Sequence, residues 1–563
     1  MSIIKRLDTV IANKIAAGEV IEKIGNVVKE LVENSIDANA NKIDIELLES
    51  GLKSIIVSDN GTGMDESDAI LAFERHATSK IFNVNDLFRI NSLGFRGEAL
   101  PSIAAISRVE LTTSNGKDSI RVIYEDGKFV GKNSASANIG TKISVTKLFY
   151  TTPARFKYLK SPQYELAVIT SMINKFALAY PEISFKLMNN QKIIFVSNGN
   201  NQVIDIIANI YSKDVARNMV AFKSESRDYK INGFTTNPIV NRSSRNYINI
   251  LVNKRSISDS KITNVIKECY EQLIPKNRYP ITVLYIECDP SIIDVNIHPR
   301  KQEIKFSEYT KLLDLIKRTI NDKIGFESIY QVVKSKDFKQ EKMVFHEPKK
   351  EVYSTIQKSE STEKPTTEAK KVIPDFEYIG QYAGTYLIYQ NEQGLYLVDQ
   401  HAAAERIRYE RYINRMSSSN SYSQDLLVPL ELSLGNDITI QLVDYLDKLV
   451  EFGIEATIEN QTIKITKIPS WFSKNYELVY TEAVVMKLIN EKTLSNRVII
   501  DDLAKLLACK HSLKANHYIT KTEADNLISD LRTCDRPYTC PHGRPIIVTV
   551  TIEQIERLFN RVI

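Results

Sequence analysis

The sequence predicts a multidomain α+β protein, and three observations on the 563-residue chain support this prediction. First, the chain is too long for one hydrophobic core, because domains usually hold about 100–200 residues. Second, runs with helical periodicity alternate with β-branched runs up to about residue 330. Third, Lys, Glu, Ser, Thr and Gln are frequent within residues 331–373, and apolar patterns resume from Pro374. We therefore expect folded parts on either side of a disordered linker.

The composition excludes several classes of protein. Hydrophobic residues make up 43% and charged residues 25%, as in ordinary globular proteins. No stretch approaches the roughly 18 apolar residues of a membrane helix, and no signal peptide is evident, so we expect a cytoplasmic protein without a membrane partner. Five cysteines do not suggest a disulfide framework and are better interpreted as core residues or metal ligands. The net charge of +5 is compatible with nucleic acid but does not identify it.

The expected elements follow from the apolar patterns in chain order. Before the linker, we expect a helix over Val27–Ile36 and strands over Ile43–Leu48, Ser54–Val57, Tyr247–Val252 and Ile281–Ile286. After the linker, we expect strands over Glu377–Gln381, Thr385–Gln390, Gly394–Val398 and Ile546–Val550. Helices are expected from Gln400 onward, over Leu503–Leu507 and over Glu553–Arg561.

The first predicted helix has a polar face whose side chains could take part in catalysis or metal binding. Glu30, Asn34 and Asp37 lie at positions i, i+4 and i+7, so they align on one side of the helix. A carboxylate there can deprotonate a water molecule, and an Asn oxygen can bind Mg²⁺. Taken alone, this pattern would be better explained by a solvated amphipathic helix.

Further segments favour a nucleotide site over that alternative. Asp59 follows a strand and can accept a hydrogen bond from a base, while Gly61 and Gly63 allow close backbone approach to a planar ligand. Ser92–Leu100 is a glycine-punctuated loop that enters a helix, an arrangement suited to wrapping phosphates. Gly140 and Thr141 begin another strand. A Walker P-loop is absent from the sequence.

These segments together resemble the motifs of the GHKL ATPase superfamily, which includes gyrase-type topoisomerases, Hsp90 chaperones, histidine kinases and MutL mismatch-repair proteins. The match narrows to the MutL family through the segments Asn13–Val20, Lys29–Ala38, Arg75–Lys80, Leu93–Ala99, Phe149–Arg155 and Asp294–Lys301. The resemblance covers about the first 330 residues and resumes from about residue 376 to the end.

The resemblance implies the domain plan. It places a GHKL (Bergerat) α/β sandwich ATPase domain over 1–210, and a transducer-like β/α domain of ribosomal-protein-like fold over 211–330. The flexible linker covers 331–373. An α/β C-terminal dimerisation and endonuclease domain covers 374–563, with an inserted subdomain over 431–495.

The resemblance also assigns roles at the ATP site. It implies that Glu30 is the general base for ATP hydrolysis, that Asn34 holds Mg²⁺ and that Asp59 recognises adenine beside Gly63. The implied phosphate lid contains Thr78, Ser79, Gly94, Phe95, Arg96 and Gly97. Thr141 is placed at the adenine end of the site, and Lys301 resembles a lysine of the second domain that reaches the γ-phosphate.

Two positions depart from the family pattern. Lys254 replaces the glycine of a family Asn-Gly-Arg turn, which puts the geometry of that turn in doubt. Asn39 replaces the glycine that follows the catalytic helix. Since Asn tolerates the left-handed conformation best after Gly, we expect it to serve as the left-handed residue at the helix end.

The segment from Asp399 to Glu410 carries a second candidate site. His401 and Glu405 lie four residues apart on the predicted helix, a spacing that metal-binding helices use. An isolated pair of this kind is more often a solvated helix face. The downstream Cys509 and the Cys540-Pro-His542 run change the balance, because they supply the softer ligands of a mixed metal site.

This segment matches a motif of MutL proteins that possess their own endonuclease. The resemblance implies a Zn²⁺ or two-metal site built from His401, Glu405, Cys509, Cys540 and His542, with Asp399 as an extra carboxylate for Mn²⁺ or Mg²⁺. We expect Asp399 and Glu405 to be catalytic in metal-assisted nicking of DNA, and Glu410 to be structural.

The same resemblance names the expected partners. They are DNA, the mismatch sensor MutS, a second copy of the chain and the sliding clamp of DNA polymerase. Gln424–Leu430 resembles a clamp-binding peptide, although a strand leading into a turn at Pro429 explains it equally well. One alternative function is an ATP-switched matchmaker whose C-terminal metal site is purely structural. A topoisomerase or an Hsp90-like chaperone is a third, weaker one.

Overall fold

The computed structural model describes residues 21–80, 93–94, 97–274, 278–294, 305–334, 373–417, 423–472, 476–490, 496–510, 518–559 and 561. The chain forms two compact units: residues 1–330 together with 423–490, and residues 331–422 together with 491–563. Within the described part, no helix combines the length and the apolar character needed to cross a membrane. The mixture of helices and sheets confirms the predicted α+β class.

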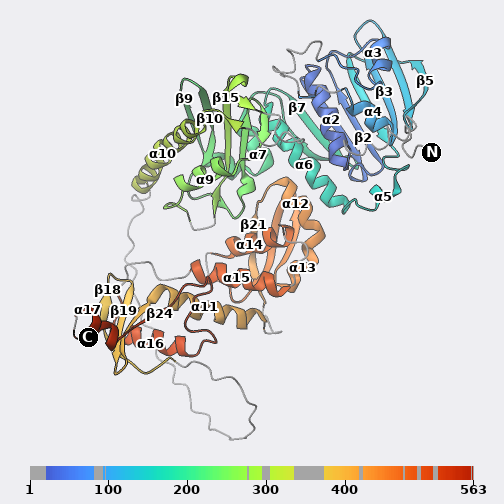
Figure 1. The fold of residues 1–563 in the computed structure, drawn as a ribbon. Coiled ribbons are helices and arrows are strands. Elements are labelled where there is room, and N and C mark those ends of the chain that lie inside the picture. Colours follow the sequence, from blue (N-terminus) through green and yellow to red (C-terminus); the bar gives the residue numbers. More distant parts are fainter. Residues whose placement is uncertain are drawn as a thin grey trace, which may run out of the picture. The chain divides into compact units, whose positions relative to one another are not determined.

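The first lobe of the larger unit is an eight-stranded mixed sheet in the order β5-β4-β3-β6-β2-β1-β7-β8. Its strands are β1 (Lys42–Leu48), β2 (Ser54–Asp59), β3 (Arg108–Ser114), β4 (Ser119–Glu125), β5 (Lys128–Ser134), β6 (Gly140–Thr146), β7 (Ser184–Asn189) and β8 (Lys192–Val196). The helices are α2 (Ile24–Asp37), α3 (Glu66–Leu71), α4 (Ala99–Ala104), α5 (Pro153–Phe156), α6 (Pro162–Ala179), α7 (Val203–Ile210) and α8 (Lys213–Arg217). Helices α2 and α6 pack side by side along the sheet (Figure 1).

The second lobe has a five-stranded sheet in the order β13-β12-β15-β10-β9. Its strands are β9 (Met219–Glu225), β10 (Tyr229–Thr236), β12 (Ile248–Val252), β13 (Arg255–Ile257) and β15 (Thr282–Cys288). Short pairs are formed by β11 (Asn241–Arg242) with β14 (Tyr279–Pro280) and by β16 (Ile293–Asp294) with β17 (Lys305–Phe306). Helices α9 (Ser260–Cys269) and α10 (Tyr309–Lys334) contribute Ile262, Ile266, Leu312 and Ile316 to its buried core.

Residues 423–490 complete the larger unit with a three-stranded sheet in the order β21-β23-β22. The strands are β21 (Ser423–Leu432), β22 (Glu455–Glu459) and β23 (Thr462–Pro469), and the helices are α12 (Asn436–Leu442), α13 (Leu446–Glu451) and α14 (Glu477–Asn490). We call residues 423–490 the inserted module.

The smaller unit contains a four-stranded antiparallel sheet in the order β18-β19-β20-β24. Its strands are β18 (Glu377–Tyr382), β19 (Tyr386–Asn391), β20 (Gly394–Asp399) and β24 (Ile547–Thr551). Its helices are α11 (Gln400–Ser417), α15 (Asn496–Lys510), α16 (Lys521–Arg532) and α17 (Ile552–Leu558). Because β20 leads straight into α11, the sheet fixes the start of the helix that carries the candidate metal ligands.

The predicted elements are confirmed to within a few residues, except that the helix expected over Leu503–Leu507 extends over Asn496–Lys510. The left-handed conformation of Asn39 is also confirmed, with a φ of 58°. The turn at Lys254 also forms, with φ values of 45° at Asn253 and 65° at Lys254. Both residues adopt the left-handed conformation that a tight hairpin turn requires, so the loss of glycine has not abolished the turn. The predicted linker lies outside the described residues beyond Lys334, up to residue 372.

Candidate nucleotide and metal sites

Helix α2 presents the polar face that the sequence predicts. Its apolar side chains Val27, Val28, Leu31 and Val32 are fully buried in the core of the first lobe. Glu30 stays partly exposed, with 27% of its side chain accessible, and the Lys29 ammonium lies 3.5 Å from its carboxylate. The core therefore fixes the helix, while Glu30 remains open to a water molecule or a ligand.

Asp59, at the end of β2, is held by three protein donors. One carboxylate oxygen accepts hydrogen bonds from the backbone N–H of Gly61 at 2.9 Å and of Thr141 at 3.2 Å. The other accepts from the Ser35 hydroxyl at 2.7 Å. The β2–β6 register places Asp59 directly opposite Thr141, so these two predicted site residues do meet. This orientation leaves a fixed carboxylate of the kind that can read an amino group.

Gly63 lies at a point of close backbone contact. Its φ is 65°, and a Cβ atom there would lie 1.9 Å from the Ser114 carbonyl oxygen. Only glycine fits this position, because any side chain would collide with backbone that cannot move away. The adjacent Met64 N–H donates to the Thr113 hydroxyl, which also contacts the Thr141 hydroxyl at 3.0 Å.

Lys80 connects the polar face of α2 to the predicted lid. Its ammonium donates to the Asn34 side-chain oxygen at 3.1 Å and to the Asp37 carboxylate. Asp37 also accepts hydrogen bonds from the backbone N–H of Leu93 at 3.0 Å and of Gly94 at 3.2 Å. The backbone donors expected to wrap phosphate oxygens are thus occupied by a carboxylate of the chain itself.

The remaining lid residues are placed only in part. Thr78 accepts a hydrogen bond from the Lys80 N–H at 3.2 Å, and Ser79 lies between them in the chain. Gly97 has a φ of 57°, and its carbonyl accepts the His76 N–H at 3.2 Å. Phe95, Arg96 and Lys301 lie outside the described residues, so their roles stay predictions.

Sequence reasoning missed three contributors to this site. Ser35 and Thr113 carry no signal in the sequence, since each is a small polar residue among other polar residues and acts through a contact distant along the chain. Lys80 stands in the Arg75–Lys80 motif, and its position there could have drawn attention to it.

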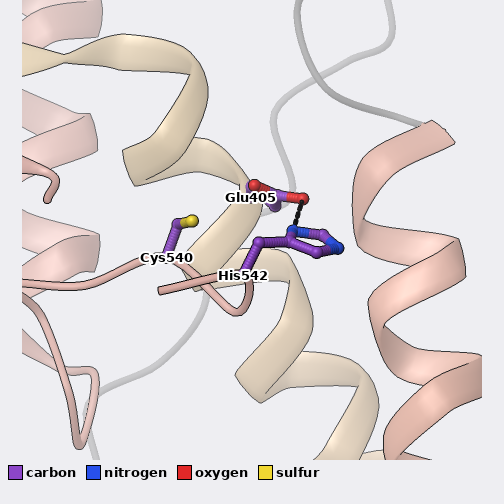
Figure 2. Close-up of side chains that lie close together, drawn as sticks. All are labelled: Glu405, Cys540 and His542. Carbon is purple, nitrogen blue, oxygen red and sulfur yellow. Dashed lines mark ion pairs between the residues drawn. The ribbon is translucent and has the colours of Figure 1, made fainter. Parts of the chain in front are cut away.

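The candidate metal site consists of Glu405, Cys540 and His542 (Figure 2). Their ligand atoms all lie within 4.8 Å of one another, and a Glu405 carboxylate oxygen is 3.0 Å from His542 Nδ1. Glu405 and Cys540 are buried, whereas 46% of the His542 side chain is exposed. This set offers one oxygen, one sulfur and one nitrogen ligand, a mixture that suits Zn²⁺. The exposed imidazole edge leaves the site accessible from one side.

Helix α11 fixes the loop that carries the two downstream ligands. The Arg406 guanidinium donates to the Thr539 carbonyl at 2.6 Å, and Glu410 accepts from the backbone N–H of Asp535 at 2.6 Å and of Arg536 at 3.2 Å. These contacts show Glu410 in the structural role that the sequence analysis gave it. Arg406 and Glu410 are one helical turn apart, and both follow Glu405 in α11, so they hold the loop at two points beside it.

The turn after Cys540 brings His542 back toward the helix. The Cys540 N–H donates to the Arg544 carbonyl at 2.8 Å, and the Gly543 N–H donates to the Cys540 carbonyl at 2.9 Å. Gly543 has a φ of 83°, which a residue with a side chain rarely adopts. The Arg544 N–H points at the Cys540 sulfur at 3.4 Å. Such an N–H···S contact stabilises a thiolate.

Three predicted ligands are not part of this group. Asp399 accepts hydrogen bonds from the backbone N–H of His401 at 2.9 Å and of Ala402 at 3.0 Å, and so caps the start of α11. Among the described residues, neither Asp399 nor His401 belongs to the close set of ligand atoms. Cys509 lies in α15, but its side chain is outside the described part. The roles of all three stay predictions.

Comparisons with known proteins assign families to three regions. Residues 22–146 match the histidine kinase-, DNA gyrase B- and HSP90-like ATPase model. Residues 207–325 match the C-terminal domain of DNA mismatch repair proteins, and residues 379–519 match the MutL C-terminal dimerisation domain.

Curated relatives are similar over almost the whole length. A DNA mismatch repair protein MutL from Listeria innocua is 40% identical, and the match covers 99% of both chains. The MutL protein of Listeria welshimeri is 41% identical with the same coverage. That of Anoxybacillus flavithermus is 40% identical over 100% of both chains.

Two solved structures resemble the N-terminal half. The N-terminal domain of a DNA repair protein is 27% identical, with a TM-score of 0.50 over 57% of this chain and 99% of that chain. The Aquifex aeolicus MutL ATPase domain complexed with ADP is 23% identical, with a TM-score of 0.38 over 53% of this chain and 98% of that chain.

Proposed function

This chain belongs to the MutL family of DNA mismatch repair proteins, and from that premise we propose that it couples ATP hydrolysis to DNA nicking by its own metal site. It carries the ATPase domain and the C-terminal dimerisation domain of that family. The observation that supports intrinsic nicking is the close set of Glu405, Cys540 and His542, which joins two distant sequence motifs. A family member that only recruits a nuclease has no need of such a site.

For the ATPase, the proposal assigns roles to the polar groups around α2. Glu30 deprotonates the attacking water, Asn34 contributes an oxygen to Mg²⁺, and Asp59 with Gly63 and Thr141 holds adenine. The partial exposure of Glu30 and the three donors on Asp59 support these roles. Thr78, Ser79 and the 94–97 segment then close over the phosphates, and Lys301 reaches the γ-phosphate.

At the C-terminal site, the donor chemistry fits Zn²⁺, with Mn²⁺ or Mg²⁺ as a second ion near Asp399. Glu405, Cys540 and His542 would hold the first ion, and His401 and Cys509 would complete the set. A bound ion there would lower the pKa of a coordinated water and polarise the phosphodiester. Glu405 and Asp399 orient the nucleophile, while Arg406 and Glu410 hold the ligand loop in place.

Nicking of supercoiled plasmid by the full chain tests the proposal. With Mn²⁺ present, Asp399→Asn should abolish nicking and leave ATP turnover intact. Glu30→Ala should abolish turnover while nucleotide still binds. Glu553→Gln, an exposed carboxylate on α17, is the matched control and should change neither activity. A fully active Asp399→Asn protein would remove the endonuclease assignment.

The second candidate, a matchmaker with a structural metal, predicts a different pattern. In that case Cys540→Ala would lower both metal content and the melting temperature, and the unaltered chain would not nick with any divalent ion. The same nicking assay, combined with metal analysis, therefore separates the two functions.

The partners proposed are DNA, MutS, a second copy of the chain and the polymerase sliding clamp. The structure supports the clamp peptide in one respect. Gln424–Leu430 lies in β21, whose pairing with β23 is interrupted between Asp425 and Leu430. Leu427 and Val428 are exposed, at 102% and 76%, so an apolar plug is presented to solvent. The alternative explanation, a strand that leads into a turn at Pro429, is right about the strand and wrong about the turn, because β21 continues to Leu432.

A further inference from the structure

The family comparison places the inserted module in the C-terminal domain, whereas the structure packs it with the N-terminal half of the chain. The match to the MutL C-terminal dimerisation domain family covers residues 379–519 and so includes the module. In the structure, residues 423–490 form one compact unit with residues 1–330. A segment of the C-terminal domain thus packs on the N-terminal half, and its contacts show how.

One helix of the module carries a buried carboxylate whose partners lie in the second lobe. The side chain of Glu482 in α14 is 3% exposed. Its Oε1 atom accepts hydrogen bonds from the Ser243 N–H at 2.8 Å and from the Ser243 hydroxyl at 3.1 Å. The Arg278 guanidinium lies 2.7 Å from the same carboxylate and is itself 6% exposed. A buried charge of this kind is tolerated only when it is paired, so the module and the lobe are complementary here.

Two further bonds join the module to the second lobe. The Arg242 guanidinium donates to the Ser433 carbonyl at 3.0 Å, and the Tyr247 hydroxyl donates to the Leu434 carbonyl at 2.7 Å. Arg278 is positioned for its pair by Asn241, whose side-chain oxygen accepts from Arg278 Nε at 2.7 Å. The lobe therefore presents prearranged donors to the chain segment that enters α12.

The module also binds the first lobe. The Asn436 and Asn174 side chains exchange amide hydrogen bonds at 2.8 Å and 3.4 Å, and both residues are buried. The Gln461 amide donates to the Ile194 carbonyl at 2.8 Å, and Met486 joins a hydrophobic core to which both lobes contribute. Since both lobes are held, a rotation of one lobe against the other must break one of these two sets of contacts.

The interface is polar and imperfectly packed. A cavity of about 50 Å³ lies among α6, α12 and the segment around Tyr247, with Asn174, Tyr211 and Asp437 in its lining. Burial raises the pKa of the Asp437 carboxyl, and the neighbouring Ser171 hydroxyl opposes that shift. Interfaces that open and close are generally more polar than permanent ones, whose cores resemble a protein interior.

We propose that residues 423–490 are a latch that docks reversibly across both N-terminal lobes of the same chain and is released when the lobes rotate. The surface of the two lobes is therefore occupied by the module of the same chain. The docking part of the proposal rests only on the hydrogen bonds and the ion pair described above. The link to nucleotide rests on the proposed ATPase cycle, in which ligand binding moves the lobes.

Charge reversal in the full chain tests docking by hydrogen exchange without nucleotide. Glu482→Arg should speed amide exchange in residues 162–179 and 241–247 by a factor on the order of 100, since it leaves Arg278 buried without its partner. Arg278→Glu should do the same for residues 477–490. The double reversal should restore part of the protection in both places, because opposite charges face each other again while Ser243 and Asn241 lose their hydrogen-bond partners. Asp447→Arg and Arg227→Glu, both at exposed positions, are the matched controls and should change nothing.

The double variant keeps the test decisive even if a single variant disturbs folding. Unchanged exchange in both single variants, or no rescue in the double variant, would overturn docking. Cross-linking of mixed light and heavy isotope-labelled chains tests whether the module docks on its own chain. Cross-links from residues 423–490 to lobes that carry the other isotope would overturn same-chain docking.

Addition of a non-hydrolysable ATP analogue with Mg²⁺ should then speed amide exchange at the interface between the module and the lobes. Constant protection under saturating nucleotide would overturn release, while plasmid nicking and ATP turnover report on the proposed function separately.

Discussion

The Ser35 hydroxyl donates a 2.7 Å hydrogen bond to the Asp59 carboxylate, linking the buried side of α2 to the end of β2. Ser35 is buried, and its hydroxyl also contacts the Leu31 carbonyl within the same helix. Helix α2, which carries the proposed general base, and the proposed adenine-reading residue are therefore joined by one small side chain.

Ser35→Ala should weaken nucleotide binding. Removing the hydroxyl leaves one oxygen of Asp59 without this donor, and a hydrogen bond to a charged group is worth about 1.5 kcal/mol. We expect the dissociation constant for ADP to rise about tenfold by calorimetry. Ser107→Ala removes a comparable buried hydroxyl, bonded to the Ile103 carbonyl, and should leave the constant unchanged. Equal affinities in the two variants would contradict the role of Ser35.

Asp37→Asn should loosen the lid in the absence of nucleotide. Both oxygens of the charged carboxylate accept hydrogen bonds, from Lys80 and from the N–H groups of Leu93 and Gly94. An amide keeps only one acceptor oxygen, and its remaining bonds are about half as strong because it is neutral. Amide exchange at residues 93 and 94 should rise roughly tenfold. Asp65→Asn, which alters a carboxylate that caps α3, serves as the comparison. Unaltered exchange at these two amides would show that the carboxylate does not restrain the lid.

Gly63→Ala should damage the nucleotide site through the backbone. The added Cβ would overlap the Ser114 carbonyl, and the positive φ adds strain, so we expect a loss of about 2–4 kcal/mol in the free energy of unfolding. Nucleotide binding should disappear with it. Gly131→Ala is the matched control, because nothing lies within 4 Å of a Cβ at that position of β5. Denaturant unfolding of both variants measures the difference, and equal stabilities would refute the argument.

The thiols outside the metal site should be slow to react. Burial raises the pKa of Cys534 to about 12 and those of Cys269 and Cys288 to about 11. These thiols are neutral at pH 8, and their alkylation should speed up only as pH approaches those values, since the thiolate is the nucleophile. The stability gained by burying neutral thiols is complete below the unfolded pKa of about 8.5 and is lost as pH rises through the folded values. Mass spectrometry after iodoacetamide treatment at pH 8 measures how fast each thiol is alkylated, and rapid labelling of Cys534 in the folded protein would contradict the prediction.

Much of the fold was accessible from the sequence because its strands and helices carry clear apolar periods. Helix α2 illustrates this: its apolar face made the helix predictable, and the structure buries that face. The pairing of Asp59 with Thr141 could not be inferred in the same way, since it depends on a register between strands distant in sequence.

The candidate metal site was predicted in part, for a related reason. Helical spacing placed Glu405 on a defined face, and in an extended segment Cys540 and His542, two residues apart, would lie on the same side. The structure instead turns the chain sharply through Gly543, so the two ligands converge by a turn and not by strand alternation. Spacing gave no hint that Asp399 would cap α11, because a cap and a metal ligand use the same carboxylate oxygens.

The pairing of β24 with β20 determines when the cluster of Glu405, Cys540 and His542 can assemble. Glu405 is synthesised more than a hundred residues before Cys540 and His542, which directly precede β24. A growing polypeptide on the ribosome therefore carries an ATPase region well before it can gather these three ligands. Any metal-dependent activity of the cluster requires a chain that extends at least through His542, so products that stop before Cys540 would lack it.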